Sequence, residues 1–268
     1  MNAGKTRISR TMLTDGVVLA LWFLASGVYC WKRNPPWILA NSLLMGVPLG
    51  YLLLRSPRVR SIRVKFVTKI IVFGDVTLLY LCERYGGWYA STALPFRLPG
   101  AAVVEEIQFT ALYVPLVIAV NERFFADGSL SPRKSMARTV LLILLWFTVA
   151  VALIPPLHFF IRDYVYFKLW CLLYLVIPIA AWVSPRFIRE GLALCFVFAG
   201  LNLFFEILAL KNNYWGFRGQ YLSTVVTFGY RFPIEEFLFY VLLSAPAVSA
   251  VYTIYKNWRQ IGGPAFTG

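Results

Sequence analysis

Two pairs of adjacent glutamates open two long apolar segments of the chain. Glu235 and Glu236 lie in Pro233-Ile-Glu-Glu-Phe-Leu-Phe239, and Glu105 and Glu106 lie in Val103-Val-Glu-Glu-Ile-Gln-Phe109. The chain has only 12 acidic residues, so these pairs hold a third of them. A carboxyl group at membrane depth is costly and is therefore a candidate functional group, with a charged helix cap at the bilayer surface as the alternative.

The chemistry open to these carboxyl groups is acid–base catalysis in an apolar setting. The chain has no dinucleotide-binding or phosphate-binding loop, one histidine (His158) and four cysteines without a CxxC pair, so we expect no cofactor and no metal. Burial and a neighbouring carboxylate both disfavour ionisation, so one Glu of a pair could donate a proton while the other accepts one. Aromatic faces could stabilise the carbocation that forms when an alkene is protonated.

Further acidic and aromatic residues near the pairs are secondary candidates. Asp75 and Glu206 lie inside apolar segments, where a polar buttress between helices and a site residue are equally compatible with the pattern. Most aromatic residues of such a chain belong to an interfacial belt, but those in the loops and beside the pairs could line a substrate site. These candidates are Trp88, Phe109, Tyr214, Trp215, Phe217 and Phe239.

Transmembrane helices must position all of these side chains. The 268 residues are 59% hydrophobic and only 14% charged, with a mean hydropathy of +0.67, which predicts an all-α integral membrane protein. The apolar segments predict about eight helices: 15–31, 37–54, 66–82, 103–125, 137–160, 164–183, 188–210 and 232–255, with a loop at 211–230. The net charge of +14 comes from Lys and Arg between the apolar segments, which favours a lipid bilayer over nucleic acid as partner and places both termini in the cytoplasm.

The chain also contains an internal repeat. Ser56-Pro57-Arg58 recurs as Ser184-Pro185-Arg186, the Tyr85–Trp88 loop recurs as Tyr214–Phe217, and the Glu105 pair recurs as the Glu235 pair, at offsets of 128 to 130 residues. We therefore expect two domains, 1–130 and 131–268, of four helices each. Because four is even, the repeats are parallel, and both glutamate pairs lie on the same side of the membrane and near the same depth.

The second half resembles a known family. Trp215-Gly-Phe217, Phe228-Gly-Tyr230 and Pro233-Ile-Glu-Glu-Phe-Leu-Phe239 are similar to the lycopene cyclase domain of the integral-membrane carotenoid cyclases, whose motif is Pro-x-Glu-Glu followed by Leu-Phe-Phe. The resemblance is good over 205–256 and weak over 73–125, where Val103 stands in place of the proline. It implies a redox-neutral cyclisation of the ψ-ends of lycopene to ionone rings, with Glu235, Glu236, Glu105 and Glu106 as the catalytic acids.

The sequence thus predicts a proton-initiated cyclase in the cytoplasmic membrane, with a long apolar isoprenoid as substrate. Three alternatives remain at this stage: a cyclase or isomerase of another long isoprenoid, a proton-coupled transporter with parallel repeats, and a scaffold subunit whose acids are only helix caps. The sequence leaves open which Glu is acid and which is base, whether one or both ends of a substrate react, and whether the chain forms a homo-oligomer.

Overall fold

The computed structural model describes residues 10–56, 62–92, 94, 103–125 and 163–259. The predicted helix at 137–160 and His158 lie outside the described residues. The other seven predicted helices are present, with ends that differ from the predicted ones by a few residues.

Most of the described chain is helical. The first part comprises α1 (Arg10–Arg33), α2 (Trp37–Asn41), η1 (Ser42–Gly46), α3 (Val47–Arg55), α4 (Ile62–Arg84), β1 (Tyr89–Ala90), α5 (Val104–Val120) and η3 (Asn121–Phe125). The second part comprises α8 (Val165–Tyr174), α9 (Val176–Val183), α10 (Arg186–Lys211), β2 (Trp215–Gly216), β3 (Thr224–Thr227), β4 (Tyr230–Pro233), α11 (Ile234–Glu236), η5 (Phe237–Leu243) and α12 (Ser244–Arg259). The three η segments are π-helical turns that continue the neighbouring α-helices.

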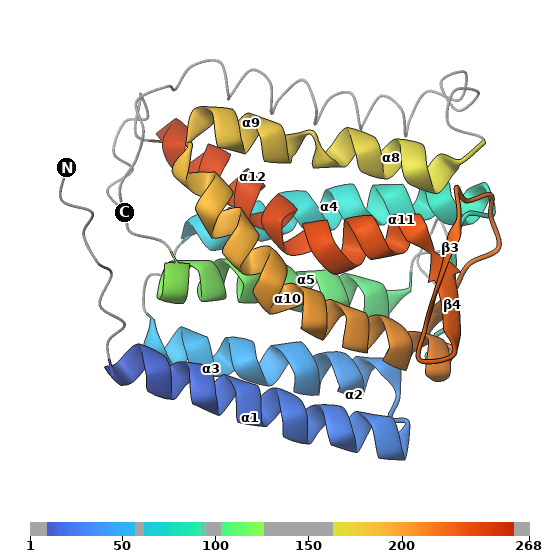
Figure 1. The fold of residues 1–268 in the computed structure, drawn as a ribbon, viewed down its shortest axis with the longest axis horizontal. Helices are drawn as coiled ribbons and strands as arrows, with labels where there is room; N and C mark the ends of the chain where they lie inside the picture. The colour runs from blue at the N-terminus through green and yellow to red at the C-terminus, as the bar shows by residue number, and fades with distance from the viewer. Residues whose placement is uncertain (1–9, 57–61, 93, 95–102, 126–162, 260–268) are drawn as a thin grey trace.

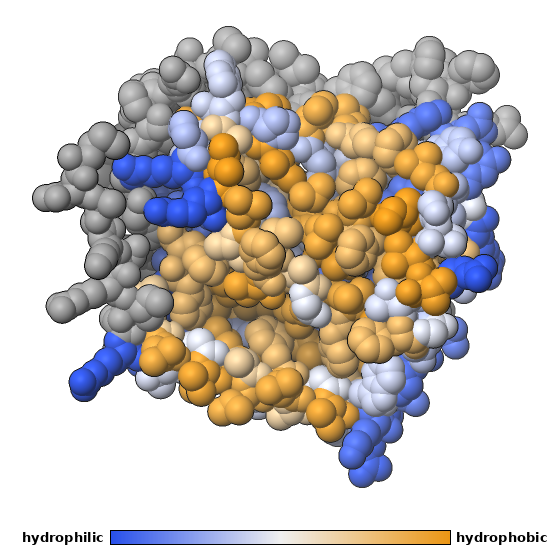
Figure 2. All heavy atoms as spheres, viewed as in Figure 1, coloured by the Kyte–Doolittle hydropathy of each residue, from blue (hydrophilic) through white to orange (hydrophobic). Residues whose placement is uncertain are grey.

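Six of the described helical segments are long and apolar enough to cross a membrane. They are Arg10–Arg33, Trp37–Arg55, Val104–Phe125, Val165–Val183, Arg186–Lys211 and Ile234–Lys256. Figure 2 shows a broad apolar face between two ends where hydrophilic residues gather, and the helices of Figure 1 run between those ends. The chain is therefore an all-α, multi-pass membrane protein in its described part.

Helix α4 differs from the six candidate spans in composition. It is 23 residues long, which is enough to cross a bilayer, but it carries Lys65, Lys69, Asp75 and Glu83 and is less apolar than the others. It packs along α5 and also contacts α8 and α12. The polar residues of α4 therefore have neighbouring helices beside them as well as lipid.

The two parts of the chain meet at α5 and α12. Helix α4 packs along α5, α10 packs along α12, and α5 and α12 contact each other. Polar side chains join them across the core: the Asn121 Nδ2 donates to Ser249 Oγ at 2.9 Å, and the Tyr113 and Ser244 hydroxyl oxygens lie 2.7 Å apart. Buried polar groups need such partners in an apolar surrounding, so these contacts fix the register of the two helices.

A charged cluster closes the end of the bundle at which α1 begins and α12 ends (Figure 1). Asp15 of α1 is fully buried, and its carboxylate accepts hydrogen bonds from Tyr51 Oη at 2.7 Å, Arg55 Nε at 3.1 Å and Arg123 Nε at 2.8 Å. The Asp15 carboxylate thereby ties α1 to α3 and η3. Lys256 of α12 pairs with Glu122 of η3 at 2.8 Å beside it.

Two short β-ladders lie at the opposite end, where the sequence predicted only loops. Strand β1 pairs antiparallel with β2, so that Tyr89 faces Gly216 and Ala90 faces Trp215, and β3 pairs with β4 in a hairpin. Figure 1 shows the hairpin standing across the helix ends. The 211–230 segment was predicted as a loop because its strands are only two to four residues long and lack a clear alternation.

Asp15→Asn tests the charged cluster. The substitution removes the negative charge that Arg55 and Arg123 share, and hydrogen bonds to charged groups are each worth about 1.5–3 kcal/mol. Because the two arginines are partly exposed, we expect a loss of about 2 kcal/mol of stability and a lower Tm in detergent. Asp163→Asn, at an exposed position, is the control, and equal melting of the two variants would contradict the assigned role of Asp15.

Candidate active site

The two glutamate pairs occupy equivalent positions at the starts of α5 and α11. Val103 is the N-cap of α5 with ψ 146°, and Pro233 is the N-cap of α11 with ψ 146°, both in extended conformation. The proline therefore precedes the helix instead of standing inside its first turn. In both helices the first turn contains the two Glu residues, as the sequence predicted.

The first Glu of each pair holds the chain that leads into its helix. Thr92 Oγ1 lies 3.0 Å from both carboxylate oxygens of Glu105, and the Leu222 amide donates to Glu235 Oε1 at 2.7 Å. In both cases the donor lies 13 residues upstream of the Glu. Glu105 and Glu235 are fully buried, and each binds the segment upstream of its helix, whereas the second oxygen of Glu235, Oε2, has no hydrogen-bond partner among the described residues.

The second Glu of each pair faces a cavity that residues from both parts of the chain line. Glu106 and Glu236 line it together with Asp75 of α4, and its volume is about 290 Å³. We call it the central cavity. Its other walls come mainly from α4, α5, α8, α9, η5 and α12, and are largely apolar and aromatic.

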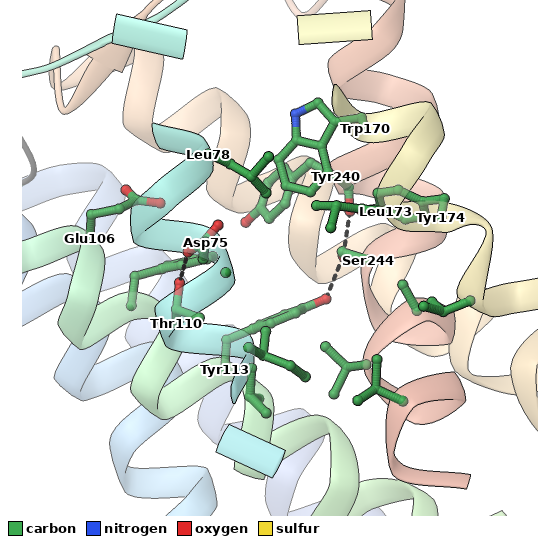
Figure 3. Close-up of a pocket in the computed structure, with 18 of the residues that line it drawn as sticks. Asp75, Leu78, Glu106, Thr110, Tyr113, Trp170, Leu173, Tyr174, Tyr240 and Ser244 are labelled. Carbon is green, nitrogen blue, oxygen red and sulfur yellow. Dashed lines mark hydrogen bonds between the residues drawn. The ribbon is translucent and has the colours of Figure 1, made fainter. Parts of the chain in front are cut away.

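Each acid of the central cavity has a different polar environment. The Tyr166 hydroxyl donates to Glu236 Oε2, and the Thr110 hydroxyl donates to Asp75 Oδ2, as Figure 3 shows for the second contact. Glu106 Oε2 is buried and has no hydrogen-bond partner among the described residues. The buried hydroxyl of Tyr240, which lines the same cavity, has none there either.

Aromatic rings form much of the cavity wall, and some of the predicted aromatic candidates are among them. Trp88, Trp215 and Phe109 line the cavity, and the Phe109 ring is stacked 5.5 Å from Tyr113. Phe217, Phe239 and Tyr214 do not line it: they pack around it against other rings. Phe217 lies 6.4 Å from Tyr166, Phe239 lies 5.3 Å from Tyr174, and Tyr214 is stacked 5.7 Å from Trp37.

Asp75 and Glu206 are the two predicted candidates inside helices, and only Asp75 lies at the cavity. Asp75 lines the cavity, whereas Glu206 does not, and Glu206 Oε2 accepts a hydrogen bond from Trp215 Nε1 at 3.1 Å. Trp215 itself lines the cavity. Glu206 of α10 is therefore placed to orient Trp215 of β2, a contact between a helix and a strand that differs from the predicted buttress between helices.

The two loops that precede the glutamate helices are packed tightly against each other. A side chain at Gly219 would bring its Cβ within 2.7 Å of Gly87 Cα, so glycine is required for this approach of two backbones. Arg218 lies over the Tyr89 ring with Cζ 4.0 Å from its centroid. Burial raises the pKa of Tyr214 and of Tyr221 in these loops to about 12, so both hydroxyls stay protonated.

Sequence reasoning missed several side chains of the cavity. Four aromatic residues of the cavity wall have no distinguishing sequence pattern: Tyr166, Trp170 and Tyr174 of α8 and Tyr240 of η5. The three in α8 lie far from the glutamate pairs in sequence, and an aromatic residue within an apolar segment is also typical of a membrane belt. The hydroxyl-bearing residues Thr110 and Ser244 had no sequence signal either. The π-helical turn directly after Glu236 is a further feature that frequently accompanies functional sites.

The site brings carboxyl groups and aromatic faces around one apolar space. Among the described residues, no group of three or more His, Cys, Asp or Glu side chains is close enough to hold a metal ion. Asp75, Glu106 and Glu236 reach the cavity from three different helices, which suits giving a proton at one point of a bound molecule and taking one at another.

Comparison of the chain with family models, with curated proteins and with solved structures finds no match.

Thr92→Val tests whether Glu105 holds its upstream segment. The substitution keeps the shape of the side chain but removes the hydroxyl donor, which leaves a buried carboxylate short of a partner. We expect a loss of about 1–3 kcal/mol in stability, measured as a lower Tm in detergent.

Thr77→Val is the matched control, because the Thr77 hydroxyl only donates to the carbonyl of Phe73 in its own helix at an exposed position. An unchanged Tm in Thr92→Val would show that the contact to Glu105 does not hold the segment.

Proposed function

We propose that the chain is a membrane-embedded isoprenoid cyclase, which converts the ψ-ends of lycopene or a similar linear carotene to ionone rings. The observation that carries the proposal is that Glu106 and Glu236, one from each pair, line the same aromatic cavity. A protonated alkene needs an acid held against carbon, exclusion of water and stabilisation of the cation. The cavity offers the carboxyl groups, the apolar walls and the ring faces for these three tasks.

The proposed reaction is balanced in protons and electrons. A carboxyl group adds one proton to the terminal double bond of the substrate, which leaves a carbocation. The electron pair of an internal double bond closes the ring, and a carboxylate then takes one proton from a ring carbon. The product is an isomer of the substrate, so the cycle consumes no oxidant or reductant and needs no cofactor.

We assign the proton transfers to the second Glu of each pair. Glu106 has an oxygen without a hydrogen-bond partner among the described residues, and Glu236 receives the Tyr166 hydroxyl inside the cavity. Glu105 and Glu235 instead bind Thr92 and Leu222 and do not line the cavity. Asp75 lies in the same cavity and is the third carboxyl group available for moving the proton.

The architecture that we propose for this enzyme is two parallel repeats of four helices, about 1–130 and 131–268, with both termini in the cytoplasm. Its support is the equivalence of the two helix starts: the caps Val103 and Pro233, and the contacts Thr92–Glu105 and Leu222–Glu235, all recur at an offset of 130 residues. The packing of α4 on α5 and of α10 on α12 repeats in the same way. Helix α5 with η3 ends at the end of the bundle where α1 begins, whereas α8 begins at the other end (Figure 1).

Expression in a cell that accumulates lycopene tests the function. We expect wild-type protein to produce ionone-ring carotenes, identified by chromatography and mass spectrometry. Glu106→Gln and Glu236→Gln should each abolish ring formation, a loss of at least about 100-fold, because each removes a proton donor or acceptor. Both variants should still accumulate in membranes.

Glu105→Gln and Glu235→Gln are the matched controls, since an amide oxygen can still accept the upstream hydrogen bond. They should retain measurable ring formation. Full activity of Glu106→Gln and Glu236→Gln would overturn the proposal, as would proton-coupled solute uptake into vesicles with no change in the carotene.

A further inference from the structure

The central cavity is long. On α4 its lining residues run from Phe66 to Cys82, which is about 24 Å along a helix that rises about 1.5 Å per residue. A space of this length, lined mainly by apolar side chains, suits an extended apolar chain.

The cavity has an acidic part and an apolar part. Glu106 and Glu236 lie at the starts of α5 and α11, and Asp75 lies beside Thr110, one turn further along α5 (Figure 3). From Asp75 to Phe66, about 14 Å along α4, no described lining residue is charged. The walls of this part include Ile70, Ile71, Leu172, Leu173, Val176 and Val251.

A pair of stacked rings lies at the far end of the apolar part. The Phe66 ring of α4 is 5.0 Å from the Tyr255 ring of α12, with the ring planes 26° apart. Phe66 lies one turn beyond Ile70, and Tyr255 lies one turn beyond Val251, so the pair joins the two walls where the lining ends. Tyr255 is buried and supports one face of the Phe66 ring, whereas Phe66 is 43% exposed, so the lining reaches the protein surface at this pair.

We propose that the central cavity is a length gauge for a linear isoprenoid chain, with Phe66 as the residue that ends it. The proposal rests on the proposed function for the reacting end, which enters between Glu106 and Glu236 while the chain extends along the helices towards Phe66. An extended chain advances about 1.2 Å per backbone bond, or about 5 Å per isoprene unit, so the cavity takes about five units. The rest of a longer substrate passes the exposed edge of the Phe66 ring and lies outside the cavity, where it adds no binding contact, so that one end of a symmetric substrate reacts per binding event.

A series of linear isoprenoid hydrocarbons of increasing length tests the gauge with the full-length protein in detergent. One readout is ring formation, as kcat/KM for each chain length. The second is binding, as displacement of a lycopene probe that quenches the fluorescence of Trp88, Trp170 and Trp215, all of which line the cavity. In the wild type we expect both to rise with length up to about five isoprene units and no further.

In Phe66→Ala, the chain length at which kcat/KM and binding stop rising, called the break below, should increase by about one isoprene unit. Phe66→Leu keeps more of the packing and should increase it less. Phe73→Ala is the matched control on the same helix, because Phe73 is 60% exposed and does not line the cavity; it should leave the break in place.

Equal behaviour of Phe66→Ala and Phe73→Ala, or no break in the length series, would overturn the gauge and leave the proposed function intact. If no isoprenoid reacts but displacement still breaks at about five units and shifts in Phe66→Ala, the proposed function fails and the gauge stands. If no isoprenoid displaces the probe, the gauge is overturned as well.

Discussion

Burial of carboxyl groups in an apolar bundle is the constraint around which this protein is arranged. A buried carboxylate without partners is costly, so each one must either be hydrogen-bonded by its own chain or be kept for a bound molecule. Glu105 and Glu235 take the first course, because Thr92 and Leu222 bind them from 13 residues upstream. Glu106 and Glu236 lie one residue further into each helix and line the central cavity, where Glu236 accepts the Tyr166 hydroxyl and Glu106 Oε2 has no partner among the described residues. One position of each pair thus fixes the helix start from which its neighbour projects.

The acids inside helices differ between the first and second parts of the chain, and only the first part contributes such an acid to the central cavity. Asp75 faces the cavity, whereas Glu206, which lies at the corresponding depth of α10, accepts a hydrogen bond from Trp215 and lies outside it. Trp215 belongs to the loop that pairs with the first loop through β1 and β2, where Gly219 and Gly87 lie too close for a side chain. The bundle thus has two glutamate pairs in the first turns of two helices and brings their second members to the same cavity. Under the proposed function, one of these glutamates gives a proton and the other removes one.

Local pattern predicted the helices and the glutamate positions well, because apolar length and the first-turn preference for carboxylates are local properties. Seven of the predicted helices lie in the described residues, and both pairs stand in first turns. The division of labour within each pair was not predictable, because Thr92 and Leu222 have different side chains and the Leu222 donor is a backbone amide. The roles of Tyr166 and Tyr240 were not predictable for a related reason. Each depends on which helices pack together, and the sequence of one apolar segment does not predict which helices it contacts. The β-ladders were not predicted because their strands are only two to four residues long.

Labelling with an apolar carbodiimide, followed by mass spectrometry, tests the central claim most directly. Such a reagent enters apolar cavities and modifies the carboxyl groups that line them. We predict modification of Glu106 and Glu236 in the detergent-solubilised protein, little modification of Glu105 and Glu235, and simultaneous protection of both modified residues by a bound linear isoprenoid. Equal modification of all four glutamates, or protection of one of Glu106 and Glu236 without the other, would contradict the account of one cavity shared by the two pairs.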